Sequence, residues 1–487
     1  MKICHKPIIL LISILFFQML NAVEGELDAT FNPSGTPPGT VVTSIASSND
    51  TAFGVAIHSD QKIVLAGLTT DPISGQQVFG LIRHNHDGTL DTSFGSGGKV
   101  VTPQVPGASS SRANDVAIQA DGKIVAVGIA SIGGQDEVVV ARYCSNGMLD
   151  DGINCGSGFG TGGFATTSGP ADINSGAANA VLIQPDGKII IGGSGNAIGG
   201  PTTFVLIRYN TDGTPDATFG LVGIVTTFIT GSSGVEISDL AFDPVTGFIV
   251  AIGRSNRAAG TTQFAVARYS IIDGSLDPLF NAGQLASLTT QQGVVVTEVP
   301  TSSPGTAIAF AGKVYPDGRI VAGGSVTALN QDFALVRYLP TGFLDLSFGN
   351  NGQVVTDFAP LTINEIIRGV ALQSDGKIIV SGTVETLSEH QFAVGRYNMD
   401  GSPDNTFNPF GLFPGFNFVT INNNSSEGFD LALQADGKIV VVGSVTSNPL
   451  DFGAARFNGI PIPSPCPLLQ NPRSTITQAI MSKYCNC

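Results

Sequence analysis

Aromatic side chains that could bind a sugar are scarce in this chain. It contains no tryptophan, and only 7 of its 487 residues are tyrosine. Five of those tyrosines stand inside a recurring Arg-Tyr dipeptide, so few rings remain to stack on a sugar. This scarcity argues against a lectin or a glycosidase.

Positive charge is scarce as well. Lysine and arginine number 23 against 38 aspartate and glutamate residues, which gives a formal net charge of −15, and no long basic run occurs. Such a chain repels phosphate groups, which argues against nucleic acid and against an anionic membrane surface as partners. Hydrophobic residues make up 42% of the chain, which is enough to build a core.

Long apolar runs are absent except near the N-terminus. There Lys2 and Lys6 precede an apolar stretch over residues 8–20, and small residues follow. This pattern predicts a secretory signal peptide over residues 1–25. An uncleaved anchor is the alternative, although a membrane span needs about 20 apolar residues. We therefore expect an exported protein, secreted or held in the periplasm or at the cell surface, with no transmembrane segment in the mature chain.

The chain has six cysteines, one of which leaves with the predicted signal peptide. Cys144 and Cys155 lie close together and are predicted to form a disulfide, which export permits. The tail contains Cys466, Cys485 and Cys487, so at least one of these is free or links to another chain. No histidine accompanies either group at zinc-site spacing, so metal ligation is the weaker alternative.

One repeated unit fills most of the remaining sequence. The stretch "IQADGKIVAVG" (residues 118–128) has seven versions, each followed by an element like "VVVARYC" and one like "LDTSFG". Each unit offers four short, β-rich pieces bounded by turn residues. Several pieces are apolar at successive positions, so both faces of their sheet must be covered. Four-stranded sheets that pack radially on copies of themselves meet this requirement and form a β-propeller.

The ends of the repetition predict how the ring closes. The first partial unit supplies one strand in "TVVTSI" (residues 40–45), whereas the last unit stops at Asn458 and lacks its fourth strand. We predict an all-β, seven-bladed propeller of four-stranded antiparallel blades over residues 26–459, closed by the N-terminal strand, which leaves no sheet edge bare. The alternative is that this strand pairs within the first full unit. Residues 460–487 are expected to form a Pro-rich linker and a Cys-containing tail.

The combination of "QxDGKIvvxG", "FaxaRYnxDGxlD" and "FG.xGxvvT" resembles the delta-60 repeat family of bacterial secreted proteins, whose repeats form propellers. The resemblance covers about residues 27–459 and is specific, because three elements recur in a fixed order. It departs at Gln61, at the longer turn from Asp243, and at the Cys-containing insertion after Leu149. The resemblance implies the fold and almost nothing about an activity.

The Asp-Gly-Lys segments lie between two apolar strands, which predicts a tight hairpin turn. A catalytic residue is normally unique in its site, whereas this turn occurs in most units, so we interpret it as structural. Its cations would line one rim of the ring, and we expect them to be solvated. They are Lys62, Lys123, Lys188, Arg319, Lys377 and Lys438.

Seven arginines and seven aspartates recur at fixed places in the units. Each arginine stands late in an apolar strand, so its guanidinium is expected to be partly buried and to need a partner. We predict one Arg–Asp ion pair per blade, held by a bidentate contact. A central anion-binding ring is the alternative. The arginines are Arg83, Arg142, Arg208, Arg268, Arg337, Arg396 and Arg456, and the aspartates are Asp28, Asp91, Asp150, Asp216, Asp277, Asp345 and Asp404.

Two histidines break the repeat. His84 stands where most units have tyrosine, and His86 follows it beside Asp87. A metal site there is possible in principle, but the segment has the pattern of the usual turn before "LD". No nucleophile, zinc or phosphate-binding motif stands in a fitting context. We predict no catalytic residue, no metal and no cofactor.

These observations favour a non-catalytic, exported propeller that is monomeric and binds an unknown protein or small ligand. One alternative is a propeller enzyme, such as a lyase, lactonase or hydrolase, with its site at the channel mouth. An enzyme needs acid, base or metal ligands concentrated in one sector, whereas the repeated polar residues are spread almost evenly. A further alternative is an envelope component tethered by the tail cysteines.

Overall fold

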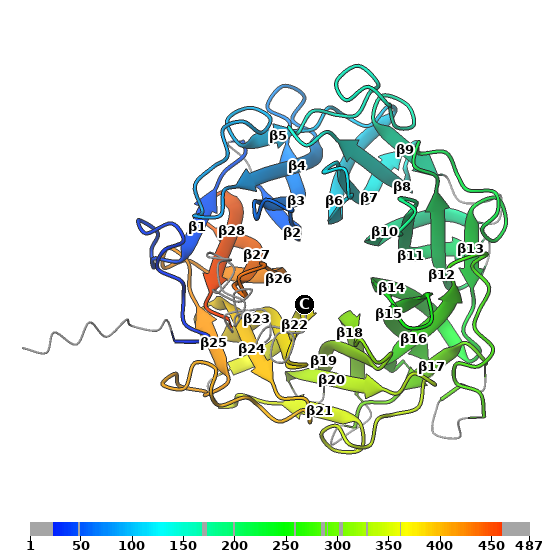
Figure 1. The fold of residues 1–487 in the computed structure, drawn as a ribbon, viewed down its shortest axis with the longest axis vertical. Coiled ribbons are helices and arrows are strands. Elements are labelled where there is room, and N and C mark those ends of the chain that lie inside the picture. Colours follow the sequence, from blue (N-terminus) through cyan, green and yellow to red (C-terminus); the bar gives the residue numbers. More distant parts are fainter. Residues whose placement is uncertain are drawn as a thin grey trace, which may run out of the picture.

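The computed structural model describes residues 23–459 except 47–48, 168–172, 198–199, 258–259, 284–287, 290, 301–304, 328–329 and 361. This part of the chain contains 28 strands and no helix, and the strands form seven four-stranded blades around a central axis (Figure 1). Among these residues there is no helix that is long and apolar enough to cross a membrane. The predicted all-β propeller is confirmed. Residues 1–22 of the predicted signal peptide and the cysteine tail lie outside the described residues, whereas residues 23–25, the end of that predicted peptide, are described.

In each blade the first strand lies nearest the axis and the last lies outermost (Figure 1). Blade 1 comprises β2 (Thr51–Ile57), β3 (Ile63–Thr70), β4 (Gln77–His84) and β5 (Lys99–Val101). Blade 2 comprises β6 (Ala108–Ile118), β7 (Ile124–Ile132), β8 (Gln135–Tyr143) and β9 (Phe164–Thr167). Blade 3 comprises β10 (Ile173–Ile183), β11 (Ile189–Ala197), β12 (Thr202–Tyr209) and β13 (Ile224–Thr227). Blades 4 and 5 comprise β14 (Ser232–Phe242), β15 (Phe248–Arg257), β16 (Thr262–Ser270) and β17 (Val294–Thr297); and β18 (Thr306–Val314), β19 (Ile320–Thr327), β20 (Gln331–Tyr338) and β21 (Gln353–Thr356). Blade 6 comprises β22 (Thr362–Leu372), β23 (Ile378–Thr386), β24 (His390–Tyr397) and β25 (Phe416–Val419), and blade 7 comprises β26 (Ser426–Leu433), β27 (Ile439–Thr446), β28 (Leu450–Phe457) and β1 (Thr40–Thr43).

The N-terminal strand completes the last blade, as the sequence predicts. β1 pairs antiparallel with β28, with Thr40 opposite Ala455 and Thr43 opposite Phe452. The alternative, pairing within the first full unit, is wrong. Because the outer edge of β28 is covered, the two chain ends of the repeat are held in one sheet.

The apolar strands are buried on both faces because blades pack on their neighbours. Seven hydrophobic cores each join two adjacent blades. The seam between blades 7 and 1 has the same kind of core, in which Val440 and Val442 pack with Ala52 and Ile63. This packing explains why strands such as β7 are apolar at successive positions.

The Asp-Gly pair, present in five of the seven repeats, forms the hairpin turn between the first two strands of a blade. In blade 2, the amide of Gly122 donates to Gln119 O at 2.9 Å, and Gly122 adopts a φ of +82°. Asp121 Oδ1 accepts from the amide of Lys123 at 3.1 Å. A left-handed φ suits glycine, and where blade 1 has Gln61 instead, that residue takes a φ of +69°. The turn prediction is confirmed.

Every inner strand contains a β-bulge at the same place, which the sequence did not indicate. In β6 the bulge leaves Asn114 unpaired between Ala113 and Asp115. The residues at this position are Phe53, Asn114, Asn179, Ser238, Phe310, Arg368 and Phe429. All of them line the central cavity, so the bulge decides which side chains face the axis.

Candidate functional site

The predicted arginine and aspartate rings meet as one ion pair in each blade. Arg208 is a typical case: its Nε donates to Asp216 Oδ2 at 2.7 Å, and both side chains are buried. In blade 7 the partner of Arg456 is Asp28, which precedes β1, with a distance of 2.9 Å from Nε to Oδ2. The remaining pairs are Arg83–Asp91, Arg142–Asp150, Arg268–Asp277, Arg337–Asp345 and Arg396–Asp404.

The contact is not the bidentate pairing with both carboxylate oxygens that the sequence predicts. Both Nε and Nη2 of Arg268 bind Asp277 Oδ2, at 2.7 and 2.5 Å, because Asp277 Oδ1 accepts instead from the amide of Leu279 at 2.9 Å. The guanidinium also lies over the phenylalanine of the third element, as with Arg268 and Phe280, whose ring centroid is 4.8 Å away. The "LDxxF" element therefore supplies both the counter-ion and the ring that cover each arginine.

Each arginine also joins its blade to the next one. Nη1 of Arg268 donates to the carbonyl of Pro340 in blade 5 at 2.6 Å. Arg396 differs, because its Nη2 binds Glu24 Oε2, in the segment before β1, at 2.5 Å. These arginines lie between blades, so they form interblade contacts and not the central anion-binding ring.

The turn lysines were expected to be solvated, and this expectation is wrong. Lys188 Nζ lies 2.7 Å from Asp216 Oδ2, and Lys377 Nζ lies 2.7 Å from Asp404 Oδ2. Burial raises the pKa of the Asp404 carboxyl, but Lys377, Thr406 and the nearby arginine outweigh it and hold the pKa at about 2. The turn cation and the blade arginine thus share one aspartate.

The histidines of blade 1 do not share a site. His84 is buried and its Nδ1 lies 3.0 Å from Gly88 O, whereas His86 is exposed with Nε2 3.1 Å from Asp436 Oδ2. Burial lowers the pKa of His84 to about 4, so this side chain is neutral at physiological pH. His84 thus replaces the repeat tyrosine inside the core.

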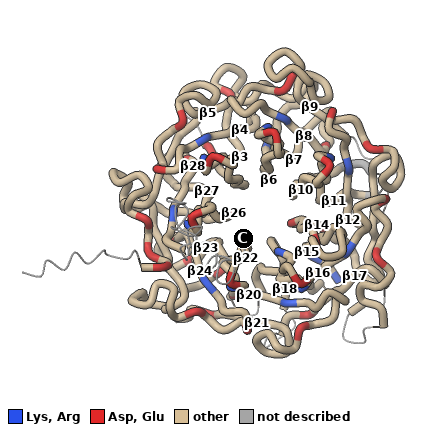
Figure 2. Tube along the Cα trace, in the orientation of Figure 1, with Lys and Arg blue, Asp and Glu red and all other residues tan. Residues whose placement is uncertain are grey.

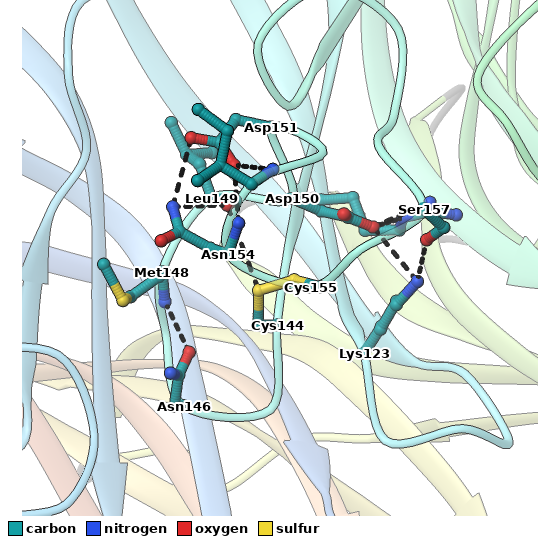
Figure 3. Close-up of a disulfide and its surroundings, with 12 residues drawn as sticks. Lys123, Cys144, Asn146, Met148, Leu149, Asp150, Asp151, Asn154, Cys155 and Ser157 are labelled. Carbon is teal, nitrogen blue, oxygen red and sulfur yellow. Dashed lines mark hydrogen bonds and ion pairs between the residues drawn. A yellow bond between two sulfur atoms is a disulfide. The ribbon is translucent and has the colours of Figure 1, made fainter.

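Cys144 and Cys155 form the predicted disulfide, with their Cα atoms 5.8 Å apart (Figure 3). The bond closes an insertion between Asp150 and Phe159 at the edge of blade 2. Lys123 still reaches Asp150 at 3.2 Å and donates to Ser157 Oγ at 2.5 Å (Figure 3). The insertion therefore loops outward without disturbing the Arg–Asp contact.

A central cavity of about 620 Å³ is lined by the inner strands of all seven blades. Its volume falls in the range of small-molecule sites. Most basic residues lie inside the ring that the outer loops form, whereas acidic residues predominate in the outer loops themselves (Figure 2). The cavity lining includes polar residues that do not recur in every blade, among them Asn114, Glu236, Lys313 and Arg368.

An arc of alternating rings and guanidinium groups runs around one side of this cavity, through blades 5, 6, 7, 1 and 2. Arg368 lies 4.9 Å from the ring centroid of Phe310 and 5.3 Å from that of Phe429. The rings of Phe429 and Phe53 are 5.3 Å apart, and Arg112 lies 5.9 Å from Phe53. We call these five residues the Phe–Arg arc.

Arg368 has no ion-pair partner among the described residues, and its Nε has no hydrogen-bond partner. Burial lowers the pKa of this guanidinium, and only the more distant Glu427 opposes the shift. A buried cation normally has a counter-ion, because the phenyl faces alone replace little of its hydration. Among the described residues, the arc therefore presents to the cavity a guanidinium that has no ion-pair partner.

On the opposite side of the cavity, the charged groups pair with neighbouring protein groups. Arg254 Nη2 lies 2.5 Å from Glu236 Oε2, and Asn179 Nδ2 donates to Glu236 Oε1 at 2.9 Å. Asn114 Nδ2 donates to Ala178 O at 2.7 Å. Because these polar groups hold one another, this side can offer shape and hydrogen bonds but no free cation.

Three aspartates one residue beyond the bulge face the cavity and join neighbouring blades. Asp430 Oδ1 accepts from the amide of Leu431 at 2.7 Å, and its Oδ2 accepts from the amide of Val55 in blade 1 at 2.9 Å. Asp115 and Asp239 make the same two contacts in blades 2 and 4. Lys313 adds one cation, 3.4 Å from Asp239 Oδ2.

Burial raises the pKa of Asp430 to about 7, with a further contribution from Asp239, while the two amides and Lys313 oppose it. Burial and Asp430 likewise raise the pKa of Asp115. Asp239 and Asp430 raise the pKa of Lys313 despite its burial, which keeps its amine charged. A charged amine cannot act as a nucleophile, so Lys313 serves to balance the acids.

Asp430 is expected to make stability depend on pH. Its folded pKa exceeds its unfolded value, so between about pH 4 and pH 7 the folded state binds more protons than the unfolded state. The free energy of unfolding should therefore fall as pH rises through this window, by at most about 1.4 kcal/mol per pH unit for this group. The Asp430→Asn variant retains an oxygen for Val55 and should show a flatter profile in urea unfolding. Parallel profiles for the variant and the wild type would contradict this assignment.

A second polar cluster lies between blades 5 and 6, away from the bulge positions. One carboxylate oxygen from each of Asp332, Asp357 and Glu365 lies within 4.8 Å of the others, the arrangement of a possible metal site. Sequence reasoning missed this cluster because its members are far apart in the unit and occur in one blade pair. It also missed the Phe–Arg arc, whose positions vary between repeats.

Seven stretches of the chain match a protein family described as a domain of unknown function (DUF5122) beta-propeller. They are residues 58–94, 119–152, 184–219, 247–280, 316–348, 373–407 and 434–459. The protein belongs to this family. The match agrees with the resemblance to delta-60 repeats, and no curated relative matches the chain.

Solved structures similar to this DUF5122 propeller have varied activities. An ulvan lyase of polysaccharide lyase family 25, bound to -[GlcA(1-4)Rha3S]-, is 10% identical, with a TM-score of 0.50 over 85% of this chain and 95% of that one. Sqt1 of Chaetomium thermophilum is 12% identical, with a TM-score of 0.42 over 86% and 98%. The GH93 alpha-L-arabinofuranosidase of Fusarium graminearum is 8% identical, with a TM-score of 0.40 over 86% and 97%. At these identities the likeness concerns the fold alone.

Proposed function

We propose that this protein is a non-catalytic binding propeller whose central cavity takes a small organic anion with a carboxylate or sulfate group. The observation that carries the proposal is Arg368, a guanidinium between two phenyl rings with no counter-ion among the described residues. The chain carries a net charge of −15, so a cation left unpaired at its centre needs a specific reason.

The Phe–Arg arc suits a ligand that is both anionic and partly apolar. A guanidinium can bind a carboxylate or sulfate through two parallel hydrogen bonds, which gives orientation as well as affinity. The faces of Phe310, Phe429 and Phe53 supply apolar contact on either side of Arg368. The side formed by Glu236 and Asn179 would then receive the neutral part of the ligand.

Loss of Arg368 should abolish recognition of the anion. We expect wild-type protein to bind benzoate more tightly than its uncharged analogue benzamide in isothermal titration calorimetry. The Arg368→Met variant should lose about tenfold or more in benzoate affinity, because a hydrogen bond to a charged group contributes about 1.5–3 kcal/mol. Arg257→Met, which removes a cation outside the cavity, is the matched control. Equal benzoate affinity in wild type and Arg368→Met would refute the proposal.

A propeller enzyme is the second candidate, and the raised pKa of Asp430 favours it, because burial holds this carboxyl near the range of a general acid. Against it, both oxygens of Asp430 already accept backbone amides, which is a structural task. Incubation with acidic polysaccharide, followed by a reducing-end assay, separates the two. Depolymerisation that is lost in Asp430→Asn would favour the enzyme.

We also propose that the protein is exported and monomeric. The Cys144–Cys155 disulfide supports an oxidising compartment, as does the N-terminal sequence pattern. Tethering through Cys466, Cys485 or Cys487 is the alternative for the tail, which lies outside the described residues. Electrophoresis of the mature protein with and without reductant tests it, since an unchanged monomer under both conditions removes the tether.

A further inference from the structure

Three carboxylates from two blades meet on the seam between blades 5 and 6. Asp332 is the second residue of β20, just before its apolar part, and Asp357 follows β21 directly. Glu365 lies on β22, the inner strand of the next blade. One oxygen of each lies within 4.8 Å of the others. They belong to neither the Arg–Asp pairs nor the lining of the central cavity.

No cation among the described residues balances this concentration of negative charge. Glu365 is 1% exposed, and its Oε2 has no hydrogen-bond partner. No lysine, arginine or histidine among the described residues acts on Asp332 or Glu365. Asp357 Oδ1 accepts from the amide of Ala359 at 2.7 Å, which leaves its other oxygen free for a ligand.

A separate buried hydroxyl faces the same point. Thr362 is 7% exposed, its Oγ1 has no completed hydrogen bond, and it lies beside the carboxyl of Glu365. A buried hydroxyl without a partner is unfavourable unless a bound species satisfies it. The cluster therefore offers four oxygen atoms of different residues, with the Thr362 hydroxyl as the side-chain donor beside Glu365.

At the equivalent place on the seam between blades 7 and 1, protein groups donate hydrogen bonds to the buried acid. Asp50 there corresponds to Glu365, counted three residues before the bulge, and Asp451 corresponds to Asp332. Asp50 accepts from Thr69 Oγ1 at 2.6 Å and from the amide of Ile45 at 2.6 Å. Ser44 occupies the place of Asp357. One seam thus satisfies its buried acid with protein donors, whereas the other places three acids beside the single hydroxyl of Thr362.

We propose that Asp332, Asp357 and Glu365, with Thr362, bind a hard divalent cation of the calcium type that cross-links blades 5 and 6. Carboxylate and hydroxyl oxygens without nitrogen or sulfur ligands are the donor set that such cations prefer.

The backbone holds the two blades in register at this point. Gln331 on β20 pairs with Asn364 on β22, and the amide of Gln331 donates to Asn364 Oδ1 at 3.2 Å. Asn364 Nδ2 in turn donates to Glu385 Oε2 at 2.6 Å. Among the described residues, this is the one pair of neighbouring blades whose sheets are joined. The ligand atoms on either side of Asn364 are therefore positioned before a cation arrives.

The test compares wild type with Glu365→Gln, after removal of metal with EDTA and dialysis of the full chain. In wild type, added CaCl₂ should raise the melting temperature and give saturable heat in isothermal titration calorimetry. Glu365→Gln should melt higher than wild type in EDTA, because like-charge repulsion is gone. It should also lose about tenfold or more in Ca²⁺ affinity. The two effects have opposite signs, so simple misfolding cannot produce them.

Two further variants keep the test decisive. Asp357→Asn alters an exposed side chain and keeps an oxygen for the amide of Ala359, and it should also lose the Ca²⁺ response. Asp375→Asn removes the same charge from a distant turn and should keep it. The proposal is overturned if wild type melts at the same temperature in EDTA and in CaCl₂, if Glu365→Gln retains the response, or if Zn²⁺ binds while Ca²⁺ does not.

Discussion

Replacing Asp28 by alanine is expected to lower the free energy of unfolding by about 3–5 kcal/mol, the usual effect of leaving one member of a buried ion pair alone. Asp28 is 3% exposed, and its Oδ2 binds Arg456 and Lys438, which come from the opposite end of the repeat. Without Asp28, the buried guanidinium of Arg456 loses its counter-ion on the seam that closes the ring.

The measurement is urea unfolding of the full chain followed by circular dichroism. Asp345→Ala, which removes the same contact from the interior of the repeat, should cost a similar amount. Only Asp28→Ala should also speed proteolytic cleavage of the N-terminal segment, because only there does the ion pair hold β1 in place. The exposed turn residue Asp60 provides the control. An Asp28→Ala variant as stable as Asp60→Ala would show that the seam does not depend on this pair.

Replacing Gly253 by alanine should destabilise the protein by about 1–3 kcal/mol or more, the usual cost of forcing atoms into a packed site. An alanine Cβ at this position would lie 1.9 Å from Glu236 O, on the facing strand beside the bulge. The last glycine of "IQADGKIVAVG", Gly128, has the same role, with a Cβ position 2.0 Å from Arg112 O. The glycine recurs because the bulge pushes a carbonyl against it in each blade.

Gly234→Ala is the matched control, since Gly234 lies on the neighbouring strand of the same blade and its Cβ would meet nothing closer than 3.5 Å. This variant should be as stable as wild type or slightly more so, because alanine restricts the unfolded chain. Thermal and urea unfolding of both variants decide the matter. Equal stability of Gly253→Ala and Gly234→Ala would mean that the bulge can relax without cost.

The sequence was a sufficient guide wherever a residue type recurs in every unit. The Asp-Gly turn, the Arg–Asp pairs and the role of the N-terminal strand all follow from residues that repeat with their neighbours. The prediction failed for the turn lysines, because Lys188 and Asp216 are 28 residues apart and nothing in the pattern shows that they meet.

The sequence by itself determined the seven units, the four strands in each, and the N-terminal strand that completes the last blade, because turn residues between short apolar strands encode them. It also determined the disulfide, because Cys144 and Cys155 lie close together in the chain. Only the tertiary structure decided what the molecule presents at its centre. The rings of Phe53 and Phe429 contact each other in a tilted arrangement although 376 residues separate them, since closing the ring makes the first and last units neighbours. The bulge turns these variable positions toward the axis, so Arg368 gains two rings and no counter-ion. The packing of blade 6 against blade 5 brings Glu365 near Asp332, a proximity that no repeat pattern contains.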